Sequence, residues 1–390
     1  MLLFDATHTS HSRAQTGIQH VCRALFAGVE ERGPVTAVCY DPHLRGWRGL
    51  DGGELAQLRD RRGAGGNSRG TKWSLRHQLT GHARRLIGRR PQLPSATGLV
   101  CPELFSARLG TALPELFRSI SGPRVALFHD AIGLKYPELT PPATVARLPA
   151  YLTELRQFDG VAAVSEDSAA SLRDFWTWLG GDVPPVQAIP LAVDPIPIDL
   201  PPAESAVGPP RLLCVGTLEG RKNHLALLDA VETLWRAGHR FELELVGLAR
   251  PDTAGPALAR LRDLQAAGRP LFYRGSVSDE NLHLAYQRCA FTVYPSLTEG
   301  FGLPVLESLQ HGRPCVCSAQ GALGESARGG GTVALASLDA PTLAAALGRL
   351  LTDPKELVRL AAAARTRRFR SWHDYTSDLA RWMSDLPRRP

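Results

Sequence analysis

The sequence predicts an α/β protein built from two doubly wound, Rossmann-like domains, and three observations support this. The chain has 390 residues, which is more than one hydrophobic core usually organises. Short apolar runs alternate with amphipathic helical patterns along most of its length, as in parallel sheets covered by helices. Residues 184–210 are rich in proline, which marks a domain boundary near the middle. We therefore expect one domain over residues 1–190 and a second over residues 191–371.

The first half opens with a strand, a polar turn, a helix and a second strand, which together form a βαβ unit. The expected strands of this half are 2–6, 35–40, 124–130 and 160–164, and the expected helices are 17–31, 73–87, 144–158 and 167–179. The unit contains no G-x-G-x-x-G, so a dinucleotide cofactor is not indicated. A nicotinamide-dependent oxidoreductase, which shares the βαβ pattern, is therefore disfavoured.

The second half repeats the alternation more regularly. Its expected strands are 211–216, 241–246, 271–274, 291–294, 315–317 and 332–335, and its expected helices are 254–267, 279–288, one that begins at Pro304, and 341–351. Alternating β and α elements of this kind predict a parallel, doubly wound sheet.

The composition is ordinary for a globular protein, with 44% hydrophobic and 21% charged residues. The seven cysteines are odd in number and lie mostly within apolar runs, which favours reduced core cysteines and a cytoplasmic setting. Cys315 and Cys317 alternate along an expected strand and have no partner pair at zinc spacing, so we interpret them as core residues. We expect neither a signal peptide nor a membrane span.

Positive charge gathers between Arg45 and Arg90, where twelve lysines and arginines stand against three acidic residues. The surplus is greater than the net charge of +7 of the whole chain. Within this segment, residues 73–87 read as a helix that mixes leucines with basic residues, and such a helix can lie on an anionic bilayer surface. A merely solvated basic face is the alternative. Nucleic acid is not expected as a partner, because the segment has no recognition fold.

The most informative stretch is the turn from Glu299 to Glu307, with the sequence EGFGLPVLE, which lies between a buried strand and a helix. Pro304 suits the first turn of a helix because its missing N–H would have no partner there. Gly300 and Gly302 let the backbone approach a ligand closely. A helix start also presents free N–H groups and a partial positive charge, which favour a phosphate or an anionic leaving group.

This turn, with its two glutamates eight positions apart, resembles the motif of the retaining glycosyltransferases of family 4. Residues 215–230, VGTLEGRKNHLALLDA, resemble the phosphate-binding motif of the same family. The resemblance extends over nearly the whole chain. It implies the GT-B fold, in which two Rossmann-like domains face each other across a cleft, and it implies that a last helix within residues 372–390 crosses back to the first domain.

The resemblance also implies roles for particular side chains. Glu307 would accept hydrogen bonds from the two ribose hydroxyls, and Glu299 with the backbone of Gly300–Leu303 would hold the donor sugar. Arg221 and Lys222 would stabilise the departing diphosphate. The implied catalytic residues are His129 and Glu299, and the implied donor-binding residues are Gly17, Arg221, Lys222, Val277, Gly300, Phe301, Gly302, Leu303 and Glu307.

Two of these assignments lie in the first half. His129 follows an expected strand, and the carboxyl ends of strands face the ligand crevice of an open α/β sheet. In the family a histidine at this place contacts the donor sugar near the reacting carbon. Gly17 stands where family members place a glycine beside the donor diphosphate, and a plain helix-start glycine is the competing interpretation.

The implied reaction moves a sugar from a nucleotide donor to a hydroxyl of a lipid-linked or polysaccharide acceptor, with retention of configuration. The GTLEGRKN run is similar to that of mannosyl- and rhamnosyltransferases that build bacterial surface polysaccharides on polyprenyl carriers. This favours GDP-mannose, while UDP- and dTDP-sugars, for glucosyl or rhamnosyl transfer, stay open. A non-catalytic nucleotide-sugar-binding or membrane-binding module is the other alternative.

No Asp-x-Asp motif occurs in the chain, so we expect no metal cofactor for the transfer, and no other cofactor. The expected location is the cytoplasm, at the inner face of the cell membrane if the basic segment binds lipid. The chain departs from the family in three places. Thr217 stands where many members have Arg, Leu191 and Ala192 replace Asn and Gly, and residues 321–325 read GALGE for GALPE.

Overall fold

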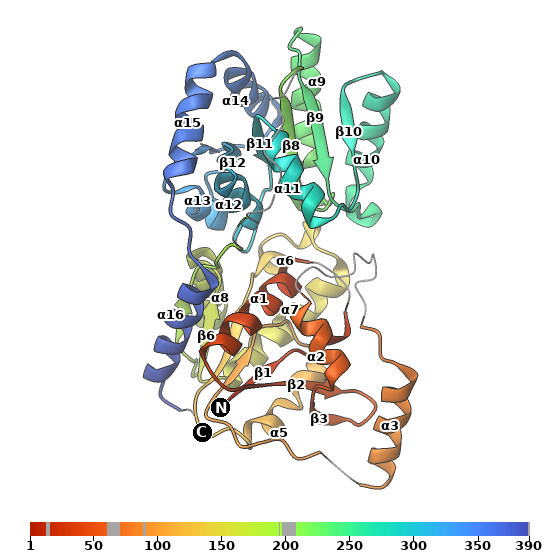
Figure 1. The fold of residues 1–390 in the computed structure, drawn as a ribbon, viewed down its shortest axis with the longest axis vertical. Helices are drawn as coiled ribbons and strands as arrows, with labels where there is room; N and C mark the ends of the chain where they lie inside the picture. Colours follow the sequence, from red (N-terminus) through yellow and green to blue (C-terminus); the bar gives the residue numbers. More distant parts are fainter. Residues whose placement is uncertain (13–15, 61–70, 89–90, 195, 197–207, 389–390) are drawn as a thin grey trace. The chain divides into compact units, whose positions relative to one another are not determined.

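The computed structural model describes residues 1–390 except 13–15, 61–70, 89–90, 195, 197–207 and 389–390, and these described residues form two compact units (Figure 1). Unit 1 consists of Met1–Ala131, Ala146–Ala192 and Arg370–Pro390, and unit 2 of Ile132–Val145 and Val193–Phe369. The predicted domains of residues 1–190 and 191–371 differ from the units at residues 132–145, which group with unit 2. Helix α7 (Pro142–Glu154) includes one of the changeovers between the units.

Unit 1 is built on a sheet with the strand order β3-β2-β1-β4-β5-β6-β7. The strands are β1 (Leu2–Asp5), β2 (Val35–Asp41), β3 (Gly46–Gly49), β4 (Leu99–Cys101), β5 (Arg124–Phe128), β6 (Gly160–Ala163) and β7 (Val186–Ala188). Neighbouring strands are parallel except β3, which pairs antiparallel with β2 at the edge. Their burial on both faces explains why most of them read as continuous apolar runs.

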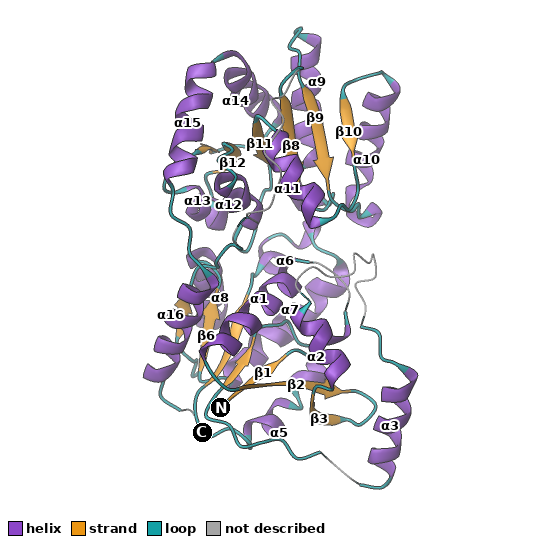
Figure 2. Cartoon of the chain, in the orientation of Figure 1, coloured by secondary structure: helices purple, strands orange, loops and turns teal. Residues whose placement is uncertain are grey.

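Helices cover this sheet (Figure 2). The helices of unit 1 are α1 (Gly17–Arg32), α2 (Gly52–Arg59), α3 (Leu75–Leu86), α4 (Ala107–Gly110), α5 (Leu113–Phe117), α8 (Glu166–Leu179) and α16 (Trp372–Asp385), with 3-10 turns η1 (Thr9–His11) and η3 (Leu155–Gln157). Helix α16 packs against α1. Gly28 of α1 allows this close approach, because a Cβ there would lie 2.8 Å from Cγ2 of Thr376.

Unit 2 contains a parallel sheet with the strand order β10-β9-β8-β11-β12-β13. The strands are β8 (Arg211–Val215), β9 (Glu242–Val246), β10 (Leu271–Tyr273), β11 (Phe291–Tyr294), β12 (Cys315–Ser318) and β13 (Thr332–Leu335). The helices are α6 (Ile132–Lys135), α9 (His224–Arg236), α10 (Pro251–Ala266), α11 (Asp279–Arg288), α12 (Leu303–Gln310), α13 (Gly321–Ala327), α14 (Ala340–Thr352) and α15 (Pro354–Thr366), with 3-10 turns η2 (Pro137–Leu139) and η4 (Gly220–Lys222).

The core of unit 2 has a layer on each face of the sheet. On one face, alternate strand residues such as Leu212 and Cys214 pack with α9, α10 and α14. On the other face, Cys315 and Cys317 of β12 pack with α12 and α13. All seven cysteines lie among the described residues, and each is buried and free of a disulfide, as the core interpretation predicts. The predicted α/β fold with two doubly wound sheets is thus confirmed.

The structure differs from the sequence prediction in detail. Helix α3 is two residues shorter at its start than predicted, because the Ser74 side chain accepts from the His77 N–H and caps it. The elements that the sequence did not predict are strands β3, β4 and β7 and helices α2, α4, α5, α6, α13 and α15. Residues 61–70 are rich in glycine, a composition that predicts a mobile loop, and they lie outside the described residues. Among the residues that the structure describes, none of the helices combines the length and apolar composition needed to cross a bilayer.

Candidate active site

The candidate site of unit 2 lies at the carboxyl ends of its parallel strands. The segments that follow β8 and β11 supply its charged residues, and these two strands are neighbours in the sheet although they are far apart in sequence. In the order of connections, the chain runs outward from β8 to β10 and then returns to β11 on the other side. Such a topological switch point is where open α/β sheets bind ligands.

The loop after β8 carries the predicted basic pair. Arg221 and Lys222 lie in the 3-10 turn η4, and α9 begins only at His224. From the sequence alone, the GRKN run reads as a helix that starts at this pair, whereas the structure starts the helix after Asn223. The reason is Asn223, whose left-handed backbone (φ 55°) separates the turn from the helix.

The two cations converge on one carboxylate, that of Glu299 after β11. Arg221 Nη1 lies 2.5 Å from Glu299 Oε2, and Lys222 Nζ lies 2.5 Å from Oε1. The Arg221 guanidinium also pairs with Glu219 at 2.8 Å. Two hydroxyls complete the cluster, because Ser296 Oγ and Tyr294 Oη donate to Glu299 Oε1 at 2.7 and 3.0 Å. The structure thus brings Arg221, Lys222 and Glu299 together in one cluster, while their roles in donor binding stay predictions.

Burial and charge act against each other in this cluster. Burial alone would raise the pKa of Glu299, but the positive charges of Lys222 and Arg221 outweigh it and hold that pKa at about 2. Burial lowers the pKa of Lys222, against the attraction of Glu299. Burial opposes the charge of Arg221 as well, yet the carboxylates of Glu299 and Glu219 leave its pKa raised. The charges of Arg221 and Lys222 are thus nearly balanced by those of Glu299 and Glu219. An anionic ligand can replace one of these carboxylates as the partner of the two cations.

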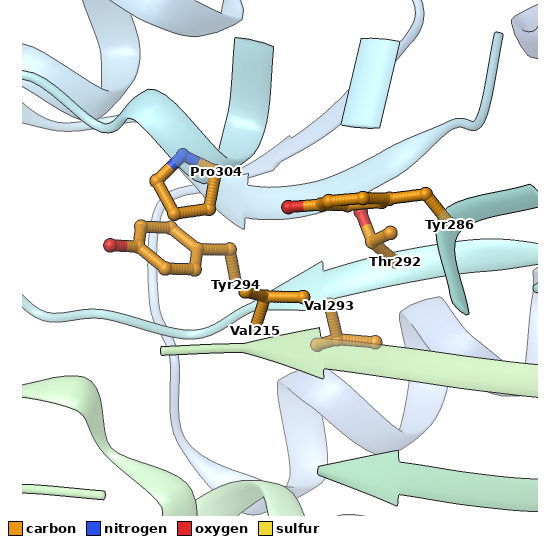
Figure 3. A pocket seen from close by; sticks show the side chains of 6 residues that line it. All are labelled: Val215, Tyr286, Thr292, Val293, Tyr294 and Pro304. Carbon is orange, nitrogen blue, oxygen red and sulfur yellow. The ribbon is translucent and has the colours of Figure 1, made fainter. Parts of the chain in front are cut away.

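The second glutamate, Glu307, lies on α12 and is held by an aromatic group. Tyr286 Oη donates to Glu307 Oε2 at 2.9 Å, and the Tyr286 ring stacks on His311, which contacts the Glu307 carbonyl through Nδ1 at 2.7 Å. Figure 3 shows a small pocket in which Pro304 lies over the ring of Tyr294 and the Tyr286 side chain lies opposite. Lys222 contacts Tyr294 and Glu307 contacts Tyr286, so the two tyrosines that line this pocket each touch one half of the predicted site.

The turn between the glutamates has the predicted sharp geometry. Gly302 has φ 100° and precedes the first residue of α12, and a Cβ there would lie 2.7 Å from Leu323 Cδ2. The Phe301 carbonyl accepts from Ser326 Oγ at 2.7 Å, which ties the turn to α13. Leu303 begins α12, one residue earlier than the predicted start at Pro304. The backbone of Gly300–Leu303 is therefore fixed on both sides, while its donor contacts stay a prediction.

The other predicted residues are described unit by unit. Val277 of unit 2, in the loop after β10, packs against the cluster that contains Tyr286. In unit 1, Gly17 is the exposed first residue of α1, with open space around its Cβ position. His129 directly follows β5 and is buried, and its Nε2 donates to the Pro102 carbonyl at 2.7 Å. Burial lowers its pKa, so the ring is neutral at pH 7. The roles of these three residues stay predictions.

Sequence reasoning missed the residues that orient the charged ones. Tyr294 and Ser296 hold Glu299, Tyr286 holds Glu307, and Glu219 shares Arg221. Glu219 stands within the basic motif and could have been noticed as a counter-charge. The tyrosines gave no signal, because each one reads as an ordinary core aromatic.

Comparisons with known proteins agree with this geometry. Residues 209–353 match the family model described as glycosyl transferases group 1. The serotype-specific mannosyltransferase WbdA of Escherichia coli is 27% identical over 344 residues, which are 81% of this chain and 38% of that protein. The O-antigen chain mannosyltransferase B of Escherichia coli is 33% identical over 168 residues, or 42% of this chain and 43% of that protein. The chain thus spans well under half the length of WbdA, and its match to mannosyltransferase B covers less than half of that protein.

Solved structures match over nearly the whole chain. HepE of Anabaena, in complex with UDP and glucose, has a TM-score of 0.67 at 16% identity and 99% coverage of both chains. Sucrose-phosphate synthase from Thermosynechococcus elongatus has a TM-score of 0.66 at 19% identity and 98% coverage of both chains. These likenesses establish the fold. The chain therefore has the GT-B fold, and its residues 209–353 are similar to the group 1 glycosyl transferases.

Proposed function

We propose that this protein is a retaining hexosyltransferase that moves mannose from GDP-mannose to a hydroxyl of a lipid-linked or polysaccharide acceptor in bacterial surface glycan synthesis. The observation that carries the proposal is the convergence of Arg221 and Lys222 on Glu299 at the switch point of unit 2. A pair of cations there suits a diphosphate leaving group, and a carboxylate between them suits the hydroxyls of a sugar. The likeness to mannosyltransferases of Escherichia coli supports mannose as the sugar.

In this mechanism the bond between the anomeric carbon and the diphosphate oxygen breaks while the acceptor oxygen attacks the same face. The departing phosphate oxygen takes the acceptor proton, so no enzyme nucleophile is needed. Arg221 and Lys222 bind the diphosphate as its negative charge grows, and to do so they give up part of their contact with Glu299. The freed Glu299 carboxylate then accepts from sugar hydroxyls, while Glu307, held by Tyr286, accepts from the ribose.

The nucleotide is tested by thermal shift with GDP, UDP and dTDP, followed by activity with the matching sugars. We expect GDP to raise the melting temperature most and GDP-mannose to be turned over. Stabilisation by UDP or dTDP and not by GDP would refute the donor assignment. If no nucleotide sugar is hydrolysed or transferred while a nucleotide still binds, the protein is a binding module and not an enzyme.

We also propose that α3 docks on an anionic membrane surface, where a lipid-linked acceptor would lie. Leu75, Leu79 and Leu86 form one stripe along this helix and are 75%, 71% and 87% exposed. Arg84 and Arg85 of the same helix are also exposed. Such a helix can bury leucines among acyl chains while arginines meet lipid phosphates.

Part of the charge in this basic segment is not available for lipid. Arg48 is buried and pairs with Asp41 and Glu54, and Arg59 pairs with Glu30. We therefore expect binding to depend on α3 itself. Co-sedimentation with phosphatidylglycerol vesicles at low salt should pull down the chain, and Leu79→Glu should release it. Equal sedimentation of Leu79→Glu, or none of the unmodified chain, would contradict membrane docking.

A further inference from the structure

A second group of chemically capable side chains lies in unit 1, apart from the candidate active site. It contains His11 of η1, Glu54 of α2 and His77 of α3, whose nearest nitrogen and oxygen atoms all lie within 4.8 Å of one another. His11 Nε2 is 2.8 Å from Glu54 Oε1, and His77 Nδ1 is 3.6 Å from the same oxygen. The His11 and Glu54 side chains are only 2% and 4% exposed, so water does little to screen them.

The other nitrogen of each histidine already has an acceptor. His11 Nδ1 lies 3.0 Å from the Thr7 carbonyl oxygen and 2.9 Å from Ser10 Oγ. The Ser10 hydroxyl donates its hydrogen to the Ala6 carbonyl, so it can only accept from His11. His11 Nδ1 must therefore carry the hydrogen. His77 Nε2 lies 2.7 Å from Asp51 Oδ2 and is a donor for the same reason. If both rings are neutral, His11 Nε2 and His77 Nδ1 carry no hydrogen, and the lone pair of each nitrogen faces the Glu54 carboxylate.

The Glu54 carboxylate has one lone pair on the side of the two histidines that accepts no hydrogen bond from Arg48 or Asp51. Its Oε2 accepts from Arg48 Nη1 at 2.7 Å and from the Asp51 N–H at 2.9 Å. Its Oε1 accepts from Arg48 Nη2 at 2.6 Å, which leaves the second lone pair of Oε1 on the side of the histidines. Three lone pairs facing one another repel unless protons or a cation lie between them.

We propose that His11 Nε2, His77 Nδ1 and Glu54 Oε1 form a structural site for a divalent transition-metal ion, and that Zn²⁺ is the ion it fits best. Two imidazoles and one carboxylate are a common zinc donor set. Tetrahedral bonds of about 2.05 Å place ligand atoms about 3.3 Å apart, and the separations of 2.8 and 3.6 Å lie on either side of that value.

The surroundings match this assignment in two ways. Each histidine donates its second N–H to a carbonyl or a carboxylate, which is the arrangement that orients zinc-bound histidines. The nearby carboxylates Asp41, Asp51 and Glu54 outnumber the single guanidinium of Arg48, which leaves an excess of two negative charges for a divalent ion to balance. Protonation of both histidines would balance the same charge without metal, and this is the alternative that the experiment must separate.

The ion would join three segments that are distant in sequence. Trp73, just before α3, stacks on the His11 ring with 3.6 Å between ring centroids. Coordination would add a direct bond from η1 and α2 to α3 and so fix the position of the helix that carries the exposed leucine stripe. This inference concerns the stability of unit 1 and does not depend on the proposed function.

The test uses the full chain, treated with a chelator and then titrated with Zn²⁺ by isothermal calorimetry, and with Co²⁺ by visible absorption. We expect one Zn²⁺ per chain, a melting temperature that rises by several degrees, and cobalt bands typical of a four-coordinate site. His11→Gln and His77→Gln should each weaken Zn²⁺ binding by at least tenfold. His82→Gln, which changes an exposed histidine on the same helix, should leave it unchanged.

Saturable binding that is lost equally in His82→Gln would place the metal elsewhere and overturn the proposal. An absence of stoichiometric binding to the unmodified chain would favour the protonated histidines and overturn it too. Circular dichroism in excess chelator checks that the variants fold like the unmodified chain, because glutamine keeps one hydrogen bond of each histidine. If a variant does not fold, the cobalt spectrum and stoichiometry of the unmodified chain decide.

Discussion

Replacement of Glu299 by glutamine tests the ion cluster of unit 2 most directly. The ordinary pKa of a glutamate is 4.5, and in this structure the pKa of Glu299 is about 2. Each pKa unit corresponds to about 1.4 kcal/mol, so ionised Glu299 contributes about 3 kcal/mol to the free energy of unfolding. Glutamine keeps the shape of the side chain but not the charge, and it leaves Arg221 and Lys222 with Glu219 as their nearby counter-charge. We expect Glu299→Gln to lower the stability at pH 7 by about 3 to 5 kcal/mol.

The pH dependence gives a second, independent readout. Because the folded-state pKa of Glu299 is lowered, its contribution is complete above about pH 4.5 and is lost as the pH falls towards 2. About 2 kcal/mol of it should be gone by pH 3. The stability difference between the unmodified chain and Glu299→Gln should therefore shrink by about 2 kcal/mol as the pH falls to 3, when both are unfolded with urea and followed by circular dichroism.

Glu356→Gln is the matched control. Glu356 also pairs with an arginine, Arg359 at 2.8 Å, but on the solvent side of α15, so its loss should change the stability by less than about 1 kcal/mol. Glu299→Gln should in addition gain more thermal stabilisation from a nucleoside diphosphate than the unmodified chain, because the ligand replaces the missing negative charge. A variant as stable as the unmodified chain at pH 7, or with the same loss on acidification, would refute the reasoning.

Other substitutions test single parts of the site. Lys222→Met should lower kcat/KM by about 30-fold or more, since a buried charge partner is typically worth at least 2 kcal/mol, and an unchanged rate would exclude Lys222 from the leaving-group contacts. Tyr286→Phe should raise the donor KM several-fold with kcat little changed, because Glu307 loses its 2.9 Å hydrogen bond; a fall in kcat alone would contradict a positioning role. Gly302→Ala should destabilise the chain by about 1 to 3 kcal/mol, since the new methyl would meet Leu323 at 2.7 Å in a backbone with φ 100°. Thermal unfolding at or above that of the unmodified chain would argue against this strain.

The sequence predicts every strand of the unit 2 sheet, but in unit 1 it misses β3, β4 and β7. Strands such as β5 and β11 are buried on both faces, so their apolar runs are visible without knowledge of the fold. Strand β3 is not visible, because its residues GWRG include a buried arginine. Arg48 belongs inside only because Asp41 and Glu54 lie beside it, and that arrangement depends on the pairing of distant segments.

In the candidate site, the sequence identifies the charged residues but not the contacts between them. Glu299, Glu307, Arg221 and Lys222 stand in short motifs and could be named from the sequence alone. The contact of both cations with Glu299 could not, since it depends on the adjacency of β8 and β11. The 3-10 turn was also beyond prediction, because Asn223 in a left-handed conformation interrupts what reads as a continuous helix.

The composition of unit 1 from separate stretches has a consequence for its biosynthesis. Helix α16 buries Trp372, Tyr375 and Leu379 in this unit. During translation these side chains leave the ribosome after all of unit 2 has been made. Unit 2 can therefore fold while unit 1 still lacks α16. Until α16 is made, the apolar surface of unit 1 that this helix covers stays exposed. We therefore expect chaperones to bind the N-terminal part of unit 1, which is synthesised first.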